Sequence, residues 1–172
     1  GIYSDTLTLT LSTVTAFIAG NDTICKNTQD EAEVSISFTG VSPFTFVYSI
    51  NGVSQLPITT TLNPHIIETK KRGNYSLVSC SDANEFGTLG GQAIVSVLTP
   101  PIAQFNAQPD SMTILFTTTQ LVDKSLGNII DWTWDFGDNT TNEFIQNPYH
   151  TYQDSIGIYQ ISLIVYDDQG CA

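Results

Sequence analysis

Few side chains in this 172-residue chain could perform acid–base or nucleophilic chemistry. The sequence contains two histidines, His65 and His150. A hydrolytic site needs a nucleophile, an adjacent base and a group that orients the base, and no motif here supplies all three. Asp135 and Asp138 could form an acid pair, but they flank Gly137. Carboxylates beside a glycine typically accept hydrogen bonds from nearby backbone N–H groups and fix a turn. We therefore predict no catalytic residue.

Two tryptophans are the candidates for ligand binding. Trp132 and Trp134 could stack on a sugar if both rings were exposed in one plane. They alternate with polar residues, however, and share their face with Ile130 and Phe136. Apolar side chains at every second position are typical of a strand with one buried face. We expect core packing for both rings, above all for Trp134, with a sugar platform as the alternative.

The composition favours β-structure to position these residues. Threonine, isoleucine and valine together account for 51 of the 172 residues. Their branched side chains lose freedom in helices and pack well on a pleated sheet. No amphipathic helical run of ten or more residues is present, and no stretch of about 20 apolar residues could span a membrane. The sequence predicts an all-β fold with no membrane insertion.

The charge is strongly negative and excludes some partners. The chain carries 17 acidic and 5 basic residues, a net charge of −12, and residues 100–172 contain Lys124 as their single base. Such a field repels phosphate backbones and anionic lipids, so nucleic acid and membrane surfaces are not expected partners. Acidity of this kind keeps an extracellular protein soluble, and recruitment of cations is the alternative.

Two domains are predicted, separated by Pro100-Pro101. Two successive prolines cannot occupy a central strand and favour an extended connection. We expect a closing strand of a preceding repeat, or a linker, at 1–15, followed by β-sandwiches at 16–99 and 100–172. The expected strands of the first sandwich are 33–39, 44–50, 58–62, 75–80 and 93–98, with an Asn51-Gly52 hairpin turn. Those of the second are 102–105, 112–116, 130–136 and 159–166.

Three cysteines allow one disulfide at most, with three pairings. Cys25 and Cys80 belong to the same predicted domain, so in an oxidising compartment we predict a Cys25–Cys80 disulfide that leaves Cys171 unpaired. Three buried free thiols are the alternative. The spacing of cysteine and histidine does not indicate zinc.

The second domain resembles the PKD domain family. The similarity lies in three motifs: Trp134-Asp-Phe-Gly-Asp-Asn139, Asn147-Pro-Tyr-His-Thr-Tyr152, and Gly157-Ile-Tyr-Gln-Ile-Ser-Leu-Ile-Val-Tyr-Asp-Asp-Gln-Gly170. The resemblance implies a seven-stranded immunoglobulin-like sandwich with Trp134, Phe136, His150, Tyr152 and Tyr159 as structural core residues. Asn139 stands where the family usually has glycine, and asparagine tolerates the left-handed backbone of that turn.

The first domain resembles immunoglobulin-like repeats of giant surface proteins from the Bacteroidota. Among the residues that carry this similarity are Gly20-Asn-Asp-Thr-Ile-Cys25, Pro43-Phe-Thr-Phe-Val-Tyr48 and Gly73-Asn-Tyr-Ser-Leu77. Such repeats followed by a PKD domain resemble gliding-motility adhesins exported by type IX secretion. The resemblance implies a secreted, cell-surface location. Its expected partners are neighbouring domains of the same chain, with surface glycans or proteins as further candidates.

The two resemblances imply two kinds of minor site. Some PKD domains bind calcium, and Asp123 and Asp167 are the weak candidates here. Two carboxylates alone fall short of the six to eight oxygens that calcium takes, so we predict no cofactor. Bacteroidota surface proteins carry hydroxyl-linked glycans at Asp-Ser/Thr triplets, which makes Thr6, Thr23, Ser111 and Ser155 glycosylation candidates.

These features together predict a non-catalytic extracellular module, the stalk, spacer or adhesion segment of a large secreted bacterial surface protein. Two alternatives remain. One is an accessory module of a secreted hydrolase that binds polysaccharide or protein, for which Trp132, Tyr149 and Tyr166 are the available aromatics. The other is a subunit of an extracellular filament in which residues 1–12 complete a neighbour's sheet.

Overall fold

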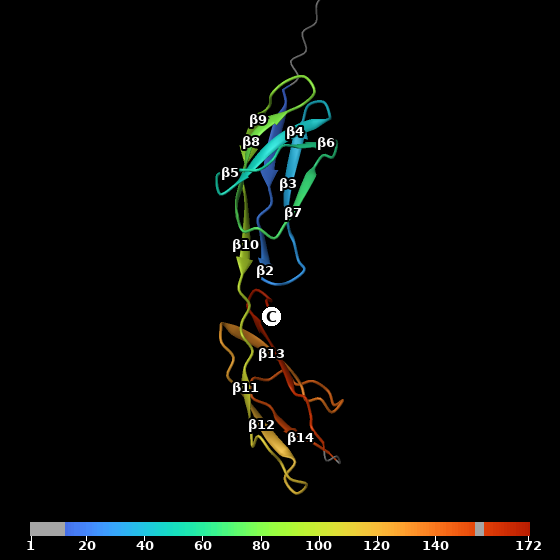
Figure 1. Cartoon of the computed structure of the whole chain (residues 1–172), viewed down its shortest axis with the longest axis vertical. Helices are drawn as coiled ribbons and strands as arrows, with labels where there is room; N and C mark the ends of the chain where they lie inside the picture. The colour runs from blue at the N-terminus through green and yellow to red at the C-terminus, as the bar shows by residue number, and fades with distance from the viewer. Residues whose placement is uncertain (1–12, 154–156) are drawn as a thin grey trace, which may run out of the picture. The chain divides into compact units, whose positions relative to one another are not determined.

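The computed structural model describes residues 13–153 and 157–172, and within them every regular element is a β-strand (Figure 1). The predicted strand at 1–15 lies largely outside the described residues. The chain divides into two compact units between Val97 and Leu98, called unit 1 and unit 2 below. No helix in the described part of the chain is long and apolar enough to cross a membrane.

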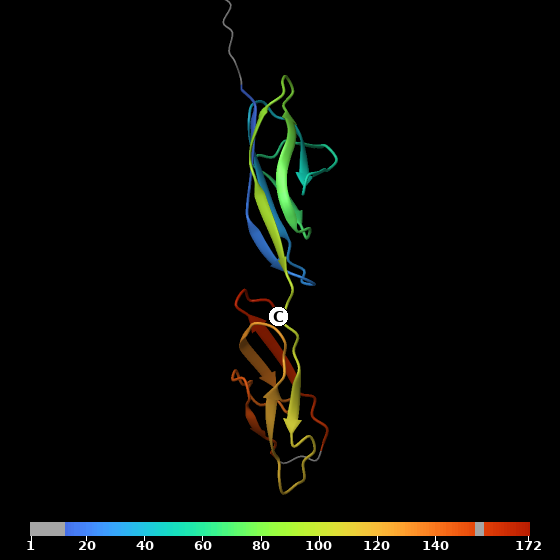
Figure 2. The same ribbon diagram turned by 90° about the vertical axis from the view of Figure 1, so that its left-hand side faces the viewer.

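Unit 1 consists of two sheets with a core between them (Figure 2). The four-stranded sheet has the order β7-β3-β1-β9, and the six-stranded sheet has the order β2-β10-β8-β4-β5 with β6 paired to β4. The first comprises β1 (Thr15–Ala19), β3 (Ala32–Thr39), β7 (His65–Thr69) and β9 (Thr88–Gly91). The second comprises β2 (Asp22–Cys25), β4 (Phe44–Ile50), β5 (Val53–Ser54), β6 (Ile58–Thr60), β8 (Gly73–Ser81) and β10 (Ala93–Leu98).

Alternation along the strands builds the core of unit 1. Val34 and Ile36 of β3 are fully buried, whereas Ser35 between them and Ser37 after Ile36 are more exposed. Phe46 and Tyr75 bring the largest buried side chains from the opposite sheet. The tyrosine hydroxyl is not left unpaired, because it donates to the carbonyl of Lys71 at 2.7 Å. Regular period-two patterns in the sequence thus correspond to the buried faces of both sheets.

The predicted hairpin turn after β4 is confirmed. Ile50 pairs with Val53 across the turn, and Asn51 and Gly52 both have positive φ angles, 51° and 81°. Two successive left-handed residues define the type I′ turn, whose twist matches that of the flanking strands.

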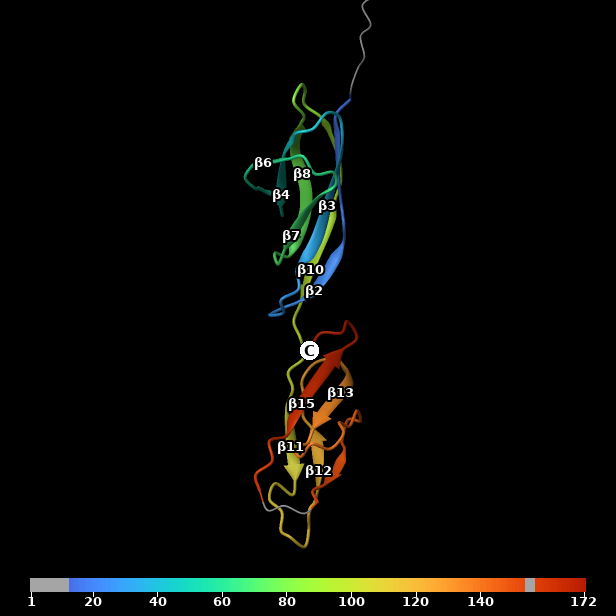
Figure 3. The ribbon, with the colours of Figure 1, turned by 90° about the vertical axis from the view of Figure 1, so that its right-hand side faces the viewer.

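Unit 2 is a smaller sandwich whose strands form two sheets (Figure 3). One sheet has the order β11-β12-β14 and the other pairs β13 with β15. Its strands are β11 (Phe105–Gln108), β12 (Thr118–Asp123), β13 (Ile129–Asp135), β14 (Tyr149–Thr151) and β15 (Ser162–Asp167). Leu121, Trp134, Phe136 and Tyr152 form its buried core. The chain is therefore all-β, with two tandem immunoglobulin-like β-sandwiches.

Four predicted features of unit 2 are wrong. The strand predicted at 102–105 begins only at Phe105 and runs to Gln108. Residues 112–116 are not a strand: Phe116 donates to the carbonyl of Thr113 in a tight turn, which leaves Ile114, Leu115 and Phe116 at least 75% exposed. The last strand begins at Ser162 rather than at residue 159. Ile130 is 60% exposed, although the sequence pattern puts it on the tryptophan face. A register shift between Ile129 and Asp131 breaks the alternation there.

The turn after β13 has the predicted backbone. Asn139 has a φ of 63°, and Gly137 has a φ of 73°. A Cβ atom at Gly137 would lie 2.4 Å from the carbonyl oxygen of Gln160, so both conformation and space require glycine there. Asparagine, by contrast, enters the left-handed region with a small penalty and can occupy the position usually held by glycine.

Candidate functional site

Asp138 and His150 are brought together in unit 2 by the turn after β13 and by β14. Nε2 of His150 lies 2.7 Å from a carboxylate oxygen of Asp138, and the side chains are only 11% and 12% exposed. The other carboxylate oxygen accepts hydrogen bonds from the amide and hydroxyl of Thr140. Burial raises the pKa of the Asp138 carboxyl, but the hydrogen bonds from Thr140 and His150 outweigh it and hold the pKa below its usual value.

Aromatic rings enclose this pair. The His150 ring stacks on Phe136 at 3.8 Å between centroids and meets Tyr152 edge-on at 4.6 Å. Tyr152 stacks on Tyr159 and donates its hydroxyl to the carbonyl of Phe136 at 2.9 Å. Burial, reinforced by the charge of Asp138 and other nearby groups, raises the pKa of Tyr152 to about 12, so the phenol stays a donor at neutral pH. The cluster therefore links the turn to β14 and the core.

The geometry around the histidines supplies no catalytic triad. His150 has its Nε2 on Asp138 and one ring face on Phe136, and within the described residues no serine or cysteine hydrogen-bonds to it. His65 belongs to unit 1, where Nδ1 lies 3.2 Å from the hydroxyl of Thr60, and no acidic residue of the described ranges pairs with it. Asp135 accepts a hydrogen bond from the amide of Gly137, the turn-fixing contact that its sequence position predicts.

The two tryptophans differ in exposure. Trp134 is fully buried, its Nε1 donates to the carbonyl of Ile145 at 2.9 Å, and its ring packs perpendicular to Phe105. It cannot contact a ligand. Trp132 is half-buried against the same core and donates its Nε1 to Asp123 at 2.9 Å. The two rings do not form an exposed platform.

The calcium candidates are engaged by the protein itself. One oxygen of Asp123 accepts from Trp132 and Gln146, and the other accepts from the amide of Ser125. Burial raises the pKa of Asp123, but these hydrogen bonds reverse the effect and lower it. Asp167 accepts from the amides of Gln169 and Cys171 in the turn after β15. The described residues contain no group of three or more side chains that could hold a metal ion.

The predicted Cys25–Cys80 disulfide is wrong. Cys80 is a free, buried thiol that faces the core of unit 1, and burial raises its pKa. Cys25 and Cys171 are disulfide-bonded. The prediction relied on both cysteines belonging to the same domain. Two residues of one domain can still lie at opposite ends of its strands.

Strand geometry explains why Cys80 and Cys25 do not meet. Figure 1 shows β2, which ends in Cys25, beside the C-terminal end of β10. In that half of unit 1, Val95 of β10 pairs with Gly73 of β8. Cys80 lies seven residues farther along β8, about 23 Å away at the usual strand rise. A disulfide requires Cα atoms within about 7 Å.

Two of the four glycosylation candidates belong to the described residues. Thr23 in β2 and Ser111 in the loop after β11 are exposed. Thr6 and Ser155 lie outside the described residues.

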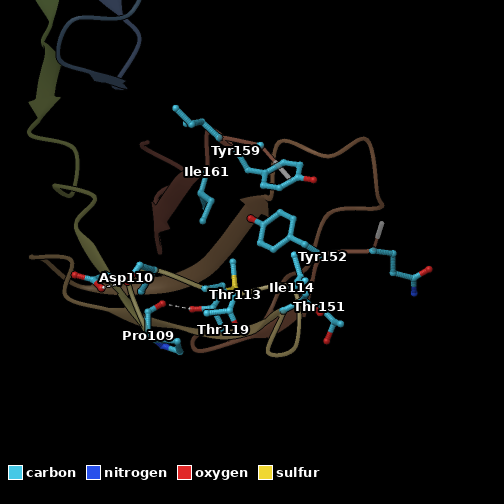
Figure 4. A pocket seen from close by; sticks show the side chains of 16 residues that line it. Pro109, Asp110, Thr113, Ile114, Thr119, Thr151, Tyr152, Tyr159 and Ile161 are labelled. Carbon is cyan, nitrogen blue, oxygen red and sulfur yellow. Dashed lines mark hydrogen bonds between the residues drawn. The ribbon is translucent and has the colours of Figure 1, made fainter. Parts of the chain in front are cut away.

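A cavity of about 880 Å³ opens on unit 2, and no sequence signal indicates it. Ala107 and Pro109 line one side, and Tyr159 and Ile161, just before β15, line another. Figure 4 shows Tyr159 and Ile161 across the cavity from Pro109 and Thr119, with Tyr152 between them. The walls are mixed, with threonine hydroxyls beside apolar carbon, and carry a single carboxylate, Asp110. The cavity is open to solvent and lies against the edge of the core.

Comparison with curated proteins finds a similarity to part of a bacterial enzyme. The pre-pro-metalloprotease PrtV of Vibrio cholerae serotype O1, in two strains, is 30% identical to this chain over 94 residues, or 55% of the chain. The match covers 10% of the protease, so the chain spans about a tenth of the length of these relatives.

Solved structures give weaker likenesses. The fibronectin(III)-like modules of Clostridium thermocellum CbhA match with a TM-score of 0.38 and 12% identity, covering 91% of this chain and 87% of theirs. The FN1–FN3 domains of chicken CNTN1 match with a TM-score of 0.39 and 9% identity, covering 89% and 59%. The fold assignment rests on the strand pairing described above and not on these scores.

The family comparison concerns unit 2. The family model described as the PKD domain matches residues 98–172, less than half of the chain. The matched range contains the turn after β13, β14 and β15. These segments include the three motifs and the Asp138–His150 pair. Unit 2 therefore matches the PKD domain family in sequence, and the motif residues Trp134, Phe136 and Tyr152 belong to its packed core.

Proposed function

We propose that this chain is a non-catalytic structural or adhesion segment of a large secreted bacterial cell-surface protein. In such a protein the two sandwiches would serve as a stalk or spacer. The observation that carries the proposal is the match of unit 2 to the PKD domain combined with the state of its polar side chains. The side chains of Asp138, His150 and Trp134, all motif residues, form hydrogen bonds within unit 2.

Two physical features support an extracellular setting. Cys25 and Cys171 are disulfide-bonded, and disulfides persist mainly in oxidising compartments outside the cytosol. The net charge of −12 disfavours binding to nucleic acid and to anionic membranes and favours solubility. Backbone pairing in both sheets and a packed core must be broken together before a sandwich extends, which suits a chain that transmits force.

Within this class of surface protein, we propose that the parent protein is a gliding-motility adhesin exported by type IX secretion. It is supported by the sequence resemblance of residues 16–99 to Bacteroidota surface repeats, and its expected partners are neighbouring domains of the same chain. Glycans on Thr23 and Ser111 would accord with this setting, because both side chains are exposed. The intact mass of protein purified from its native cells tests for these glycans, and a mass equal to the bare polypeptide excludes them.

The similarity to a metalloprotease favours a second candidate function. An accessory module beside a catalytic domain would bind polysaccharide or protein rather than act as a spacer. Of the three aromatics predicted for this role, Tyr149 is 68% exposed, whereas Trp132 and Tyr166 are half-buried. Binding through these side chains would be weak and confined to a small area.

Surface labelling and binding assays distinguish the two candidates. For the stalk, we expect antibody raised against this chain to label intact native cells, and the purified chain to bind no member of polysaccharide and matrix-protein arrays. For the accessory module, we expect the parent protein in the culture medium together with protease activity. Array binding that is lost in Tyr149→Ala and retained in Tyr166→Ala would reject the stalk in favour of the accessory module.

A further inference from the structure

The strands by which the chain enters unit 1 are bonded directly to the strands by which it leaves. β1 pairs with β9 in parallel, with Thr15 opposite Thr88 and Ile18 opposite Gly91. The amide of Thr88 also donates to the carbonyl of Val14 at 3.0 Å, just before β1. In the other sheet, β2 and β10 are neighbours. The two ends of unit 1 are therefore held to each other within both sheets.

The chain enters and leaves unit 1 at opposite ends of its strands. β1 begins near Cys80, because Gly87, which precedes Thr88, donates its amide to the Cys80 carbonyl at 2.8 Å. β10 leaves near the start of β8, where Val95 pairs with Gly73. These two ends of β8 are about 23 Å apart at the usual strand rise. Figure 1 shows β9 near the first of these ends and the last residues of β10 at the second.

Tension along the backbone loads the β1–β9 pair in shear. Tension pulls β1 toward its own start, and it pulls β10, with the β9 strand that precedes it, toward the end of β10. The two parallel strands are thus drawn in opposite directions along their axes. Their ladder bonds run across that direction, so the bonds share the load and break together. Strands opened from one end, by contrast, lose their bonds one after another.

The backbone groups that join the two strands can be identified residue by residue. Alternate residues of a strand point their N–H and C=O groups to the same side. Because the Val14 carbonyl accepts from Thr88, the backbone groups of Ala16 also face β9. On β9, the amides of Thr88 and Gly90 face β1, whereas the amide of Leu89 faces away from it. β9 is the edge strand of its sheet, so the Leu89 amide is not part of the ladder.

A phenylalanine ring covers the pair on the outer face of the sheet. Phe17 of β1 is 54% exposed, and its register partner on β9 is Gly90. A Cβ atom at Gly90 would lie 3.0 Å from the ring and one at Gly91 would lie 3.1 Å from it, so the ring lies against both glycines. Glycines weaken a strand because they offer no side chain to pack, and an aromatic ring from the next strand compensates for this. Phe17 therefore shields the β1–β9 bonds from water.

We propose that the β1–β9 pair is a mechanical clamp, the contact that keeps unit 1 folded under tension and the first to rupture. The inference deepens the proposed stalk role and rests on it for its biological meaning. Cys25 follows β1 in the chain, so tension from the N-terminal side reaches β1 whether this disulfide-bonded cysteine is oxidised or reduced. The clamp is a property of unit 1 alone and can be measured on the purified chain.

The test holds the full chain by its two ends at constant force and records how long unit 1 stays folded, with and without a reductant. Trp134→Ala, which removes the fold of unit 2, identifies the unfolding step of unit 1. Thr88→Pro deletes the amide that donates to Val14 and should shorten the lifetime roughly tenfold, the effect of one lost hydrogen bond. The matched control Leu89→Pro places the same ring one residue later, where the amide faces away, and should change the lifetime less than about threefold.

A further variant separates a clamp from ordinary stability. Tyr75→Phe removes the bond from the buried Tyr75 hydroxyl to the Lys71 carbonyl, at 2.7 Å, outside the β1–β9 pair. It should lower the urea midpoint of unit 1, followed by circular dichroism, about as much as Thr88→Pro does. Its lifetime under force should nevertheless change less than about threefold, because interactions that are still intact when the clamp breaks do not affect the unfolding rate.

Equal lifetimes of Thr88→Pro and Leu89→Pro overturn the proposal. A loss of lifetime in Tyr75→Phe as large as that in Thr88→Pro also overturns it, because the whole unit then yields at once.

If Thr88→Pro fails to fold, a second pair of variants decides. Phe17 and Ile66 are both exposed on the outer face of the same sheet, but only Phe17 lies against β9. Phe17→Ala should shorten the lifetime about threefold or more through the lost packing, and Ile66→Ala should leave it nearly unchanged. Equal effects refute the clamp. Surface labelling of native cells tests the stalk role separately, so failure of the clamp and failure of the proposed function remain distinguishable.

Discussion

Replacement of Trp134 by alanine should unfold unit 2 while leaving unit 1 intact. The indole is fully buried between the sheets and packs perpendicular to Phe105 at 5.1 Å. Buried tryptophan-to-alanine changes cost about 3–5 kcal/mol through lost transfer energy and the cavity left behind. The change also removes the hydrogen bond that the indole Nε1 donates to the Ile145 carbonyl, which adds about 1 kcal/mol. The whole free energy of unfolding of a domain of this size is of the same order as this loss.

The two tryptophans make the assay specific for unit 2, because both lie within it. Urea unfolding followed by fluorescence therefore reports this unit alone, and Trp132 remains as the reporter in Trp134→Ala. With a slope of about 1 kcal/mol/M for a unit this small, we expect the midpoint to fall by roughly 4 M or more, or the unit to be unfolded without urea.

Two control variants separate the contributions to this loss. Trp134→Phe keeps most of the ring packing and loses the Nε1 hydrogen bond, so its cost should be less than half that of alanine. Trp132→Ala removes a half-buried ring and should also cost clearly less. A Trp134→Ala midpoint close to that of the wild type, with an unchanged slope, would show that the indole is not the anchor of this core.

Three further predictions concern single side chains. The pKa of Asp138 is lowered on folding, so its carboxylate stabilises unit 2 above about pH 4 and loses this effect as the pH falls through its folded-state pKa. Asp138→Asn should therefore have a lower urea midpoint than the wild type at pH 7, and the difference between the two midpoints should shrink near about pH 3. A difference that grows in acid would contradict this. Asn139→Gly should be nearly neutral and Asn139→Ala should cost about 1 kcal/mol, because the φ of 63° is left-handed; equal midpoints would refute the strain argument. Finally, unreduced protein should show one thiol per chain after denaturation and none before, because Cys80 is buried and the other two cysteines are disulfide-bonded; rapid labelling of the native protein would contradict its burial.

The sequence by itself determined the local features that depend on neighbours along the chain. The alternation of Val34 and Ile36 predicts which face of β3 is buried, because strand side chains alternate with a period of two. Asn51-Gly52 and Asn139 predict left-handed turns, because few residues tolerate positive φ. The aspartates beside Gly137 are identified correctly as turn residues for the same local reason.

Only the tertiary structure decided the features that depend on strand order and on which end of a strand meets another. Cys80 and Cys25 belong to one domain, yet lie near opposite ends of its strands, and no local pattern records that separation. The apolar run at 112–116 reads as a strand, but a turn between Thr113 and Phe116 exposes it. The cavity beside Tyr159 and Ile161 arises from the packing of segments that are far apart in the sequence, since a sequence pattern specifies a buried face but not the neighbour that covers it.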